Sequence, residues 1–265
     1  MIKNKMVVKA KKHFGQNFLI DENVKDKIIQ AIPNDETIKV VEIGAGLGDL
    51  TKRLLKSFSV VAYEVDSDLI KHLKCVFKSE IENGRFLLSA GDVLEFWNEK
   101  KSLHDSFYWL IANIPYNIST PILTNALVDA KCKNMLVMVQ KEFAQKLSAK
   151  SKTVNFSPIS ILAEIVGDVK ILFDVPPTSF EPQPKVVSSV VKIEKRDNLE
   201  IDFFKLQKYL KKAFVAPRKR LQKNLMHGFE KELVFGAFNE LDIDLNLRPH
   251  ELSSDGHFRL FNKLN

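Results

Sequence analysis

The residues with the most specific chemical potential are Asn113 to Tyr116, the stretch "NIPY" that follows the apolar run "FYWLIA". The Asn113 side-chain oxygen and the backbone carbonyl of Ile114 or Pro115 can accept hydrogen bonds from the two protons of an amine, which orients the amine and favours a more pyramidal nitrogen. Tyr116 offers an aromatic face on which a base removed from its stack can lie. The stretch therefore predicts a site that activates the exocyclic amine of a base; a plain turn at a strand end is the alternative.

A second group of residues predicts a bound adenosine. In "VEIGAGLGDLT", Gly44, Gly46 and Gly48 let the backbone turn sharply and approach a ligand without Cβ atoms in the way. Glu64 lies twenty residues after Gly44, where a carboxylate can accept hydrogen bonds from both hydroxyls of a ribose. Asp92, at the end of "LLSAGD", is placed to accept from an adenine amino group.

Two adenosine-containing cofactors fit a glycine-rich turn followed by an acid. The spacing here is G-x-G-x-G, one residue tighter than the dinucleotide fingerprint, and a mere tight turn is the simplest alternative. NAD enzymes also use an acid at the Glu64 position, but the third acid and the absence of an evident hydride-transfer constellation favour S-adenosylmethionine. In this hypothesis the amine at Asn113 attacks the methyl group of the sulfonium.

The elements that must position these residues alternate along the chain. Apolar runs such as "TIKVVEIG" (37–44) predict strands, and "DLTKRLLKSF", in which Asp49 can cap the first turn, predicts a helix. The same plan repeats over 59–77, 85–96, 106–130 and 134–149. This alternation predicts a parallel sheet with helices on both faces, in which ligands bind outside the carboxyl ends of the strands. The chemically unusual residues all fall at those ends.

The charged residues are unevenly distributed. The net charge is +7, but two blocks without any acidic residue, 1–20 and 205–223, carry thirteen basic residues, so the rest of the chain sums to 7 − 13 = −6. Two such blocks are typical of a surface that binds a polyanion such as RNA. The alternative is a solvated helix face, because Leu206, Leu210 and Phe214 recur at helical spacing. The basic residues are Lys3, Lys5, Lys9, Lys11, Lys12, Lys205, Lys208, Lys211, Lys212, Arg218, Lys219, Arg220 and Lys223.

Composition excludes several other classes of protein. The apolar runs are short and interrupted by charge, so we expect no membrane span, no signal peptide and a cytoplasmic location. Cys75 and Cys132 stand alone, without the paired spacing of a zinc site or a disulfide framework. We therefore expect two buried, reduced thiols and no metal ion.

Six motifs occur in the order and spacing of the ribosomal-RNA adenine dimethyltransferase family (the KsgA type), and the chain resembles that family over nearly its whole length. They are "KKHFGQNFLIDENV", "VEIGAGLGDLT", "YEVD", "GDVL", "NIPYNIST" and "SFEPQPKVVSSVV". The resemblance implies a Rossmann-like class I S-adenosylmethionine-dependent methyltransferase domain with a seven-stranded, mostly parallel sheet over residues 1–195, and a small all-α domain over 196–265. It also implies transfer of two methyl groups to each of two adjacent adenosines near the 3′ end of small-subunit (16S) rRNA. The implied partner is a pre-30S particle late in its biogenesis, bound by a monomer.

The same resemblance assigns roles to single residues. Asn17 and Leu19 would close over the cofactor, and Phe180 would sandwich the target base opposite Tyr116. The other implied cofactor contacts are Gly44, Gly46, Glu64, Asp92 and Asn113, and the expected RNA contacts are Lys11, Lys12, Arg218, Lys219, Arg220 and Lys223. Ile114 stands where the family usually has Leu, a change that leaves the backbone carbonyl in place. Ala216-Pro217 interrupts the family's basic segment, so we expect a helix that starts at Arg218.

Three other functions remain open at this point. Methyltransferases that modify large-subunit rRNA and confer antibiotic resistance share several of the motifs, although "KKHFGQNFL" and the C-terminal third favour the small-subunit enzyme. A catalytically weak assembly factor would keep the pocket, but the intact Asn113, Pro115 and Tyr116 argue against it. An NAD-linked oxidoreductase would be distinguished by the cofactor that protects it against heat.

Overall fold

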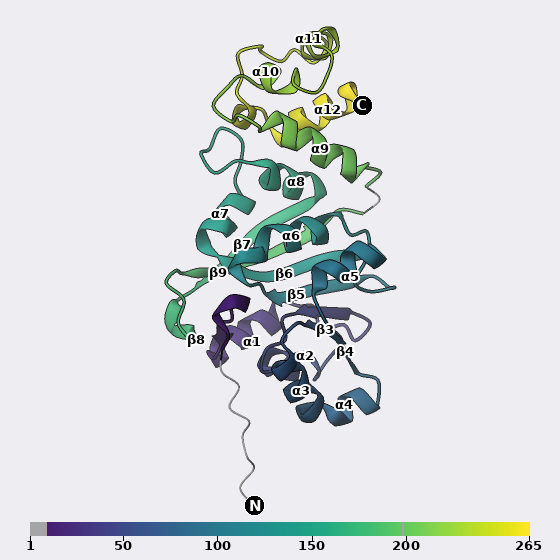
Figure 1. The fold of residues 1–265 in the computed structure, drawn as a ribbon, viewed down its shortest axis with the longest axis vertical. Helices are drawn as coiled ribbons and strands as arrows, with labels where there is room; N and C mark the ends of the chain where they lie inside the picture. Colours follow the sequence, from purple (N-terminus) through teal and green to yellow (C-terminus); the bar gives the residue numbers. More distant parts are fainter. Residues whose placement is uncertain (1–9, 198) are drawn as a thin grey trace, which may run out of the picture. The chain divides into compact units, whose positions relative to one another are not determined.

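The structure is a computed structural model that describes residues 10–197 and 199–265. Its elements follow the alternation predicted from the sequence, and two short strands pair apart from the main sheet (Figure 1). The strands are β1 (Phe18–Leu19), β2 (Lys39–Ile43), β3 (Ser59–Glu64), β4 (Phe86–Ala90), β5 (Tyr108–Asn113), β6 (Cys132–Gln140), β7 (Gly167–Val175), β8 (Phe180–Glu181) and β9 (Ser188–Lys195). The α-helices are α1 (Glu22–Gln30), α2 (Asp49–Leu54), α3 (Ser67–Val76), α4 (Lys78–Glu82), α5 (Val93–Lys100), α6 (Ser119–Val128), α7 (Lys141–Leu147), α8 (Pro158–Val166), α9 (Phe203–Ala213), α10 (Leu221–Leu225), α11 (Lys231–Glu240) and α12 (Ser254–Leu264). The 3₁₀ turns are η1 (Lys12–Phe14), η2 (Tyr116–Ile118), η3 (Pro177–Ser179) and η4 (Pro249–Glu251).

Seven strands form one sheet in the order β4-β3-β2-β5-β6-β9-β7. The five strands from β4 to β6 are parallel to their neighbours, and β9 runs antiparallel to β6. The carboxyl ends of β2, β3, β4 and β5 therefore lie along one edge of the sheet. The prediction of a seven-stranded, mostly parallel sheet is confirmed.

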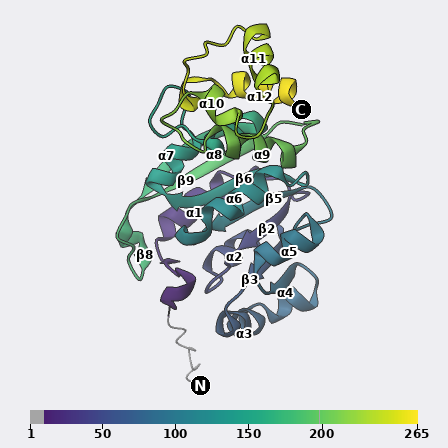
Figure 2. The same cartoon turned by 45° about the horizontal axis from the view of Figure 1, so that its top comes forward.

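Both faces of the sheet are buried. Val40 and Val41 are neighbours in β2 with side chains on opposite faces, and both are 0% exposed. Val40 packs in one hydrophobic cluster with Ile28 of α1 and Leu54 of α2. On the other side α6 lies against β6 (Figures 1 and 2). Strands covered on both faces read as continuous apolar runs, which is why "KVVEI" and "YWLIA" could be recognised in the sequence.

Aspartates start several of the helices that follow strands or turns. The side chains of Asp21, Asp66 and Asp92 each accept a hydrogen bond from a backbone N–H in the first turn of α1, α3 and α5. In α2 the capping position belongs instead to Gly48, with φ of 83°, and Asp49 is the first residue of the helix. The expectation that Asp49 caps this helix was therefore wrong by one position.

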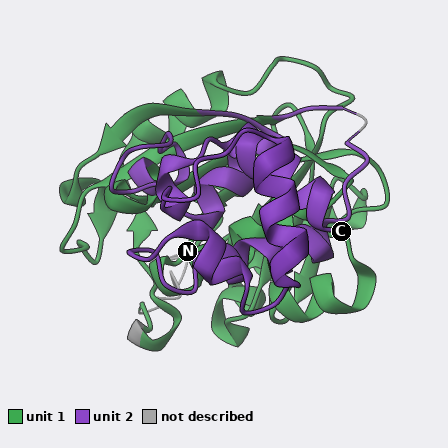
Figure 3. Cartoon of the chain, turned by 90° about the horizontal axis from the view of Figure 1, so that it is seen from above, with its two compact units in different colours: residues 1–144, 170–194 green, residues 145–169, 195–265 purple. Residues whose placement is uncertain are grey.

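The contacts within the chain define two compact units (Figure 3). The first contains residues 1–144 and 170–194, and the second contains residues 145–169 and 195–265. The predicted boundary after residue 195 falls beside the start of the second unit's C-terminal part, but the second unit also takes in α8, which sequence reasoning had left with the N-terminal part. The assignment of domains to 1–195 and 196–265 stays a prediction. Among the described helices, none has the length and apolar character that a membrane span requires.

The segment after α9 differs from its prediction. Pro217 lies in a turn closed by a hydrogen bond from the Lys219 N–H to the Ala216 carbonyl, 2.9 Å long, and the next helix begins only at Leu221. The side-chain amide of Asn224 donates to two carbonyls, those of Ala213 at 2.7 Å and Ala216 at 3.0 Å, which holds the turn against α10. The proline starts a turn here, so the predicted helix start at Arg218 was wrong.

Candidate active site

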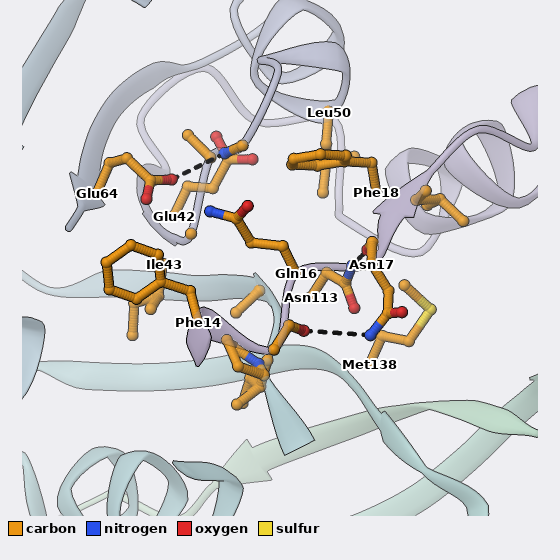
Figure 4. Close-up of a pocket in the computed structure, with 18 of the residues that line it drawn as sticks. Phe14, Gln16, Asn17, Phe18, Glu42, Ile43, Leu50, Glu64, Asn113 and Met138 are labelled. Atoms are coloured by element: carbon orange, nitrogen blue, oxygen red, sulfur yellow. Dashed lines mark hydrogen bonds between the residues drawn. The ribbon is translucent and has the colours of Figure 1, made fainter. Parts of the chain in front are cut away.

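A cavity of about 270 Å³ lies at the carboxyl ends of the parallel strands, within the first unit (Figure 4). Its walls bring together residues that are far apart in the sequence, as the predicted arrangement requires. Nine of the predicted site residues line it: Asn17, Leu19, Gly44, Gly46, Glu64, Asp92, Asn113, Pro115 and Tyr116. Phe180 is not among them.

The glycine loop after β2 shapes one wall of this cavity. Gly44 has φ of 72°, a region that favours glycine, and a Cβ built there would meet no atom within 4 Å. Open space beside Gly44 is what a ligand in close contact with the backbone needs. Gly46 and Gly48 are restricted by packing as well, because a Cβ would meet the ring of Phe18 at 3.2 Å or of Phe77 at 2.4 Å.

Glu64 ends β3 and is held by backbone donors. Its Oε2 accepts the N–H of Gly46 at 3.0 Å, and its Oε1 accepts the N–H groups of Val65 and Asp66 at 3.0 and 3.1 Å. Burial raises the pKa of Glu64, although these hydrogen bonds work in the opposite direction. The carboxylate is thus fixed at the cavity wall beside the glycine loop.

Asp92 lies after β4, at the start of α5. Its Oδ1 accepts the Leu94 N–H at 2.8 Å, which fixes the rotation of the side chain. The side chain is exposed and lines the cavity. The structure therefore brings Glu64 and Asp92 to the same cavity, from the ends of neighbouring strands.

Asn113 ends β5, and its amide has a defined orientation. Its Nδ2 donates to the backbone carbonyl of Asn17 at 2.9 Å (Figure 4). A carbonyl can only accept, so the amide nitrogen must face Asn17, and Oδ1 is left as an acceptor on the other side. Sequence reasoning predicted the acceptor at Asn113 but not the partner that orients it.

Two backbone carbonyls were candidates for the second acceptor. The carbonyl of Pro115 already accepts from the Ile118 N–H at 3.1 Å and from the Ser119 hydroxyl at 3.2 Å, which uses both of its lone pairs. The N–H of Ile114 donates to the Met138 carbonyl at 3.1 Å, whereas no donor within the described residues contacts the Ile114 carbonyl. Of the two, the Ile114 carbonyl is the available acceptor.

The two predicted base-stacking aromatics have different environments. Tyr116 is half-buried and lines the cavity, and its hydroxyl shares a hydrogen bond of 2.7 Å with Ser188 in β9. Burial raises the pKa of Tyr116, with the Ser188 hydrogen bond acting against it. Phe180 is 1% exposed, pairs with Leu19 across the β1-β8 ladder and belongs to the hydrophobic core. The structure thus corrects the placement of Phe180 as a cavity wall opposite Tyr116.

Glu42 is a cavity residue that sequence reasoning missed. It is 2% exposed in β2, and its Oε2 accepts the Thr51 hydroxyl at 2.6 Å. Burial, followed by the nearby charge of Glu64, raises its pKa to about 7 against the Thr51 hydrogen bond. A single carboxylate inside the apolar run "KVVEIG" was the available signal, because a charged residue in a buried strand calls for a partner.

The segment before β1 covers the cavity and uses Lys11 to do so. The Lys11 ammonium pairs with Asp66 at 2.6 Å and with Asp68 at 2.7 Å, and Gln16 donates to Asp66 at 2.9 Å. Hydrogen bonds to Asp66, and then to Asp68, raise the pKa of Lys11. In this structure Lys11 joins the segment to α3 and is not presented as a phosphate contact. Lys12 lies in η1, and its RNA role stays a prediction; Lys3, Lys5 and Lys9 lie outside the described residues.

The other predicted RNA contacts belong to the second unit. Arg218, Lys219, Arg220 and Lys223 are all exposed, in the turn before α10 and in α10 itself. None of the four forms an ion pair with another described residue. Their charge is therefore available at the surface, and their contact with RNA stays a prediction.

The cysteines and other metal-binding side chains form no cluster. Within residues 10–197 and 199–265, no three His, Cys, Asp or Glu side chains are arranged to hold a metal ion. Cys132 is buried and its thiol donates to the Asn134 carbonyl at 3.7 Å, whereas Cys75 is exposed. The expectation of two buried thiols was correct only for Cys132.

The sheet order, the glycine loop and the acids at the ends of β3 and β4 define a Rossmann-like methyltransferase of the S-adenosylmethionine-dependent class. Residues 7–265 match the family model described as ribosomal RNA adenine dimethylase, and the chain belongs to this family. It is 48% identical over 260 residues to ribosomal RNA small subunit methyltransferase A of Aliarcobacter butzleri (strain RM4018), covering 97% of each chain.

Two solved structures resemble the whole fold. The dimethyladenosine transferase of Plasmodium falciparum has a TM-score of 0.79 and 27% identity, covering 93% of this chain and 98% of that one. The 23S rRNA methyltransferase ErmE has a TM-score of 0.69 and 21% identity, covering 94% and 99%. At that identity the likeness to ErmE concerns the fold alone.

Proposed function

We propose that this protein transfers methyl groups from S-adenosylmethionine to the exocyclic amines of two adjacent adenosines near the 3′ end of small-subunit (16S) rRNA. The observation that carries the proposal is the orientation of Asn113, whose amide nitrogen is engaged by Asn17 so that Oδ1 is left as an acceptor. The substrate would be the rRNA within a pre-30S particle late in its biogenesis, bound in the cytoplasm by a monomer.

The residues of the cavity suit S-adenosylmethionine. The open space beside Gly44 allows close contact with the backbone, and Glu64 and Asp92 offer acceptors for a ribose and for an adenine amino group. Asn17 and Leu19 line the same cavity from the segment before α1, where they would cover the bound cofactor. When bound, the cofactor supplies an electrophilic methyl group on a sulfonium and leaves as a thioether.

The corner after β5 would prepare the adenine amine for attack. Asn113 Oδ1 and the Ile114 carbonyl can each accept one of the two N–H groups, which fixes the amine and points its lone pair along one direction. As the nitrogen–methyl bond forms, the nitrogen becomes positive, and the two oxygen dipoles stabilise that charge. Because Pro115 has no N–H, it leaves no unsatisfied donor at the corner.

Tyr116 would hold the target base after it leaves its stack. Its hydroxyl is anchored on Ser188, so the ring is fixed before the base arrives. Base stacking on an aromatic ring is worth ~1–3 kcal/mol, which offsets part of the cost of removing the base from RNA. Phe180 could take part only after a rearrangement, since its ring is part of the core here.

The choice of the small subunit is supported by sequence similarity. The relative with 48% identity over nearly the full chain is named as a small-subunit methyltransferase. The large-subunit alternative has only the shared fold of ErmE in its favour. A catalytically weak assembly factor is disfavoured because Asn113 keeps the oriented amide that the chemistry needs.

The test is methyl transfer from tritiated S-adenosylmethionine to small subunits that lack the modification, followed by mapping of the labelled bases. We expect label on two adjacent adenosines near the 3′ end of 16S rRNA. Label on large-subunit rRNA would select the alternative substrate. Binding of the subunit without any transferred label would identify an assembly factor instead.

A further inference from the structure

Lys25 places a buried ammonium group at the cavity wall. Its residue is 2% exposed on the inner face of α1, next to Val24, and it lines the cavity. Among the described lining residues it is the only lysine or arginine. An ammonium removed from water is costly unless something compensates it, so this position calls for a partner.

The partners within the chain compensate Lys25 only in part. Its Nζ donates to Glu22 at 2.7 Å and lies 3.7 Å from Asp49, and these two side chains are 65% and 52% exposed. Ion pairs with exposed carboxylates are weak because water screens them. Glu22 is also paired with Arg53. An ammonium has three N–H donors, so Lys25 can serve a further acceptor from the cavity.

The charges of the cavity match an amino acid in its zwitterionic form. Glu64 and Asp92, from β3 and β4, are suited to an adenosine, whereas Lys25 and the buried Glu42 come from α1 and β2. A buried acid and a buried base in one cavity complement an α-ammonium and an α-carboxylate. The adenosine and the amino acid would then occupy different strand ends of the same cavity.

We propose that Lys25 binds the carboxylate of the amino-acid part of S-adenosylmethionine, an assignment that rests on the proposed cofactor. In a site shielded from water, a hydrogen bond between an ammonium and a carboxylate is short and strong. Lys25 is thus a cofactor-positioning residue: it fixes the end of the cofactor remote from the target amine, and through it the direction of the sulfonium methyl group.

The test compares two ligands that differ in the amino-acid part. S-adenosylhomocysteine carries it, and 5′-methylthioadenosine lacks it. By calorimetry, Lys25→Met should weaken S-adenosylhomocysteine about 10- to 100-fold, the usual effect of losing a hydrogen bond to a charged group, and should change 5′-methylthioadenosine by less than about threefold. Lys25→Arg should restore part of the loss. Lys27→Met, an exposed lysine on the same helix, is the matched control and should leave both affinities unchanged.

A measurement on the unaltered protein covers the case in which Lys25→Met does not fold. S-adenosylhomocysteine with its carboxylate converted to a carboxamide should bind the unaltered protein more weakly by the same factor. Equal weakening of both ligands by Lys25→Met, or no loss with the carboxamide, would overturn the inference while leaving the cofactor assignment intact. If neither S-adenosylhomocysteine nor 5′-methylthioadenosine binds the unaltered protein, the proposed cofactor itself is wrong.

Discussion

Replacing Glu42 by Gln should stabilise the cofactor-free protein at high pH and have a much smaller effect at low pH. Glu42 is 2% exposed, and burial is the main cause that raises its pKa to about 7 from 4.5. Between these two values the folded protein keeps a proton that the unfolded chain has lost. Stability therefore falls as the pH rises through this window, and above pH 7 the folded state carries the full cost of a buried negative charge.

The magnitude follows from the two pKa values. The gap from 4.5 to about 7 corresponds to a cost of about 3 kcal/mol at pH 8, because each pH unit is worth ~1.36 kcal/mol. At pH 5 the cost is only about 1 kcal/mol, because the folded protein is still protonated there. Gln cannot ionise, so the difference in unfolding free energy between variant and unaltered protein should grow by about 2 to 3 kcal/mol from pH 5 to pH 8. Any pH-independent cost of the new amide cancels in this comparison.

Urea unfolding followed by tryptophan fluorescence is the suitable assay. Both tryptophans, Trp97 and Trp109, are buried in the same unit as Glu42, at 4% and 8% exposure, so the signal reports on that unit. Glu36→Gln removes an exposed carboxylate of the same unit and serves as the control. A gap between Glu42→Gln and the unaltered protein that stays constant from pH 5 to pH 8 would refute the reasoning.

Three further predictions concern the cofactor, the chemistry and the RNA. Glu64→Ala should weaken S-adenosylhomocysteine by about tenfold or more, because two hydroxyls lose their acceptor; calorimetry that shows NADH binding and no S-adenosylhomocysteine binding to the unaltered protein would sink the cofactor assignment. Asn113→Ala should lower methyl transfer at saturating cofactor by ~10²-fold or more while RNA affinity is nearly intact; near-normal turnover would mean that the corner is only a turn. Neutralising Arg218, Lys219 and Arg220 together should weaken RNA binding and flatten the slope of log K against log salt by ~0.7–0.9 for each phosphate that no longer meets a positive charge; an unchanged slope would mean that this basic turn is merely solvated. Stability in the triple variant should change by less than ~0.5 kcal/mol, since all three side chains are exposed.

The sheet and most of the cavity could be predicted because their signals are local. A strand covered on both faces is a continuous apolar run, and a tight turn next to a ligand requires glycine, so "KVVEIGAG" carries both signals within eight residues. The parallel alternation then places the ends of β2, β3, β4 and β5 on one edge without any knowledge of side-chain contacts. Gly44, Glu64, Asp92 and Asn113 meet in the cavity for this reason.

The features that were missed depend on contacts between distant segments. Lys11 was grouped with RNA contacts by its charge, but Asp66 and Asp68, more than fifty residues away, claim its ammonium. Phe180 was assigned a stacking role, yet the β1-β8 ladder carries its ring into the core. Lys25 lies at a position where helical spacing gives no reason to expect a buried charge. Whether a charge or a ring faces solvent, core or cavity is decided by tertiary packing, which no local pattern reports.

The acceptor at Asn113 itself depends on such a distant contact. Its amide is oriented by the carbonyl of Asn17, 96 residues earlier in the chain. The segment that supplies this carbonyl is fixed at both sides, by Gln16 on Asp66 and by Phe18 against the glycine loop at Gly46. The cover of the cofactor site and the orientation of the amine acceptor therefore belong to one structural unit. An Asn-x-Pro-Tyr corner without this segment would keep its turn but lose the reason for its amide oxygen to face the substrate.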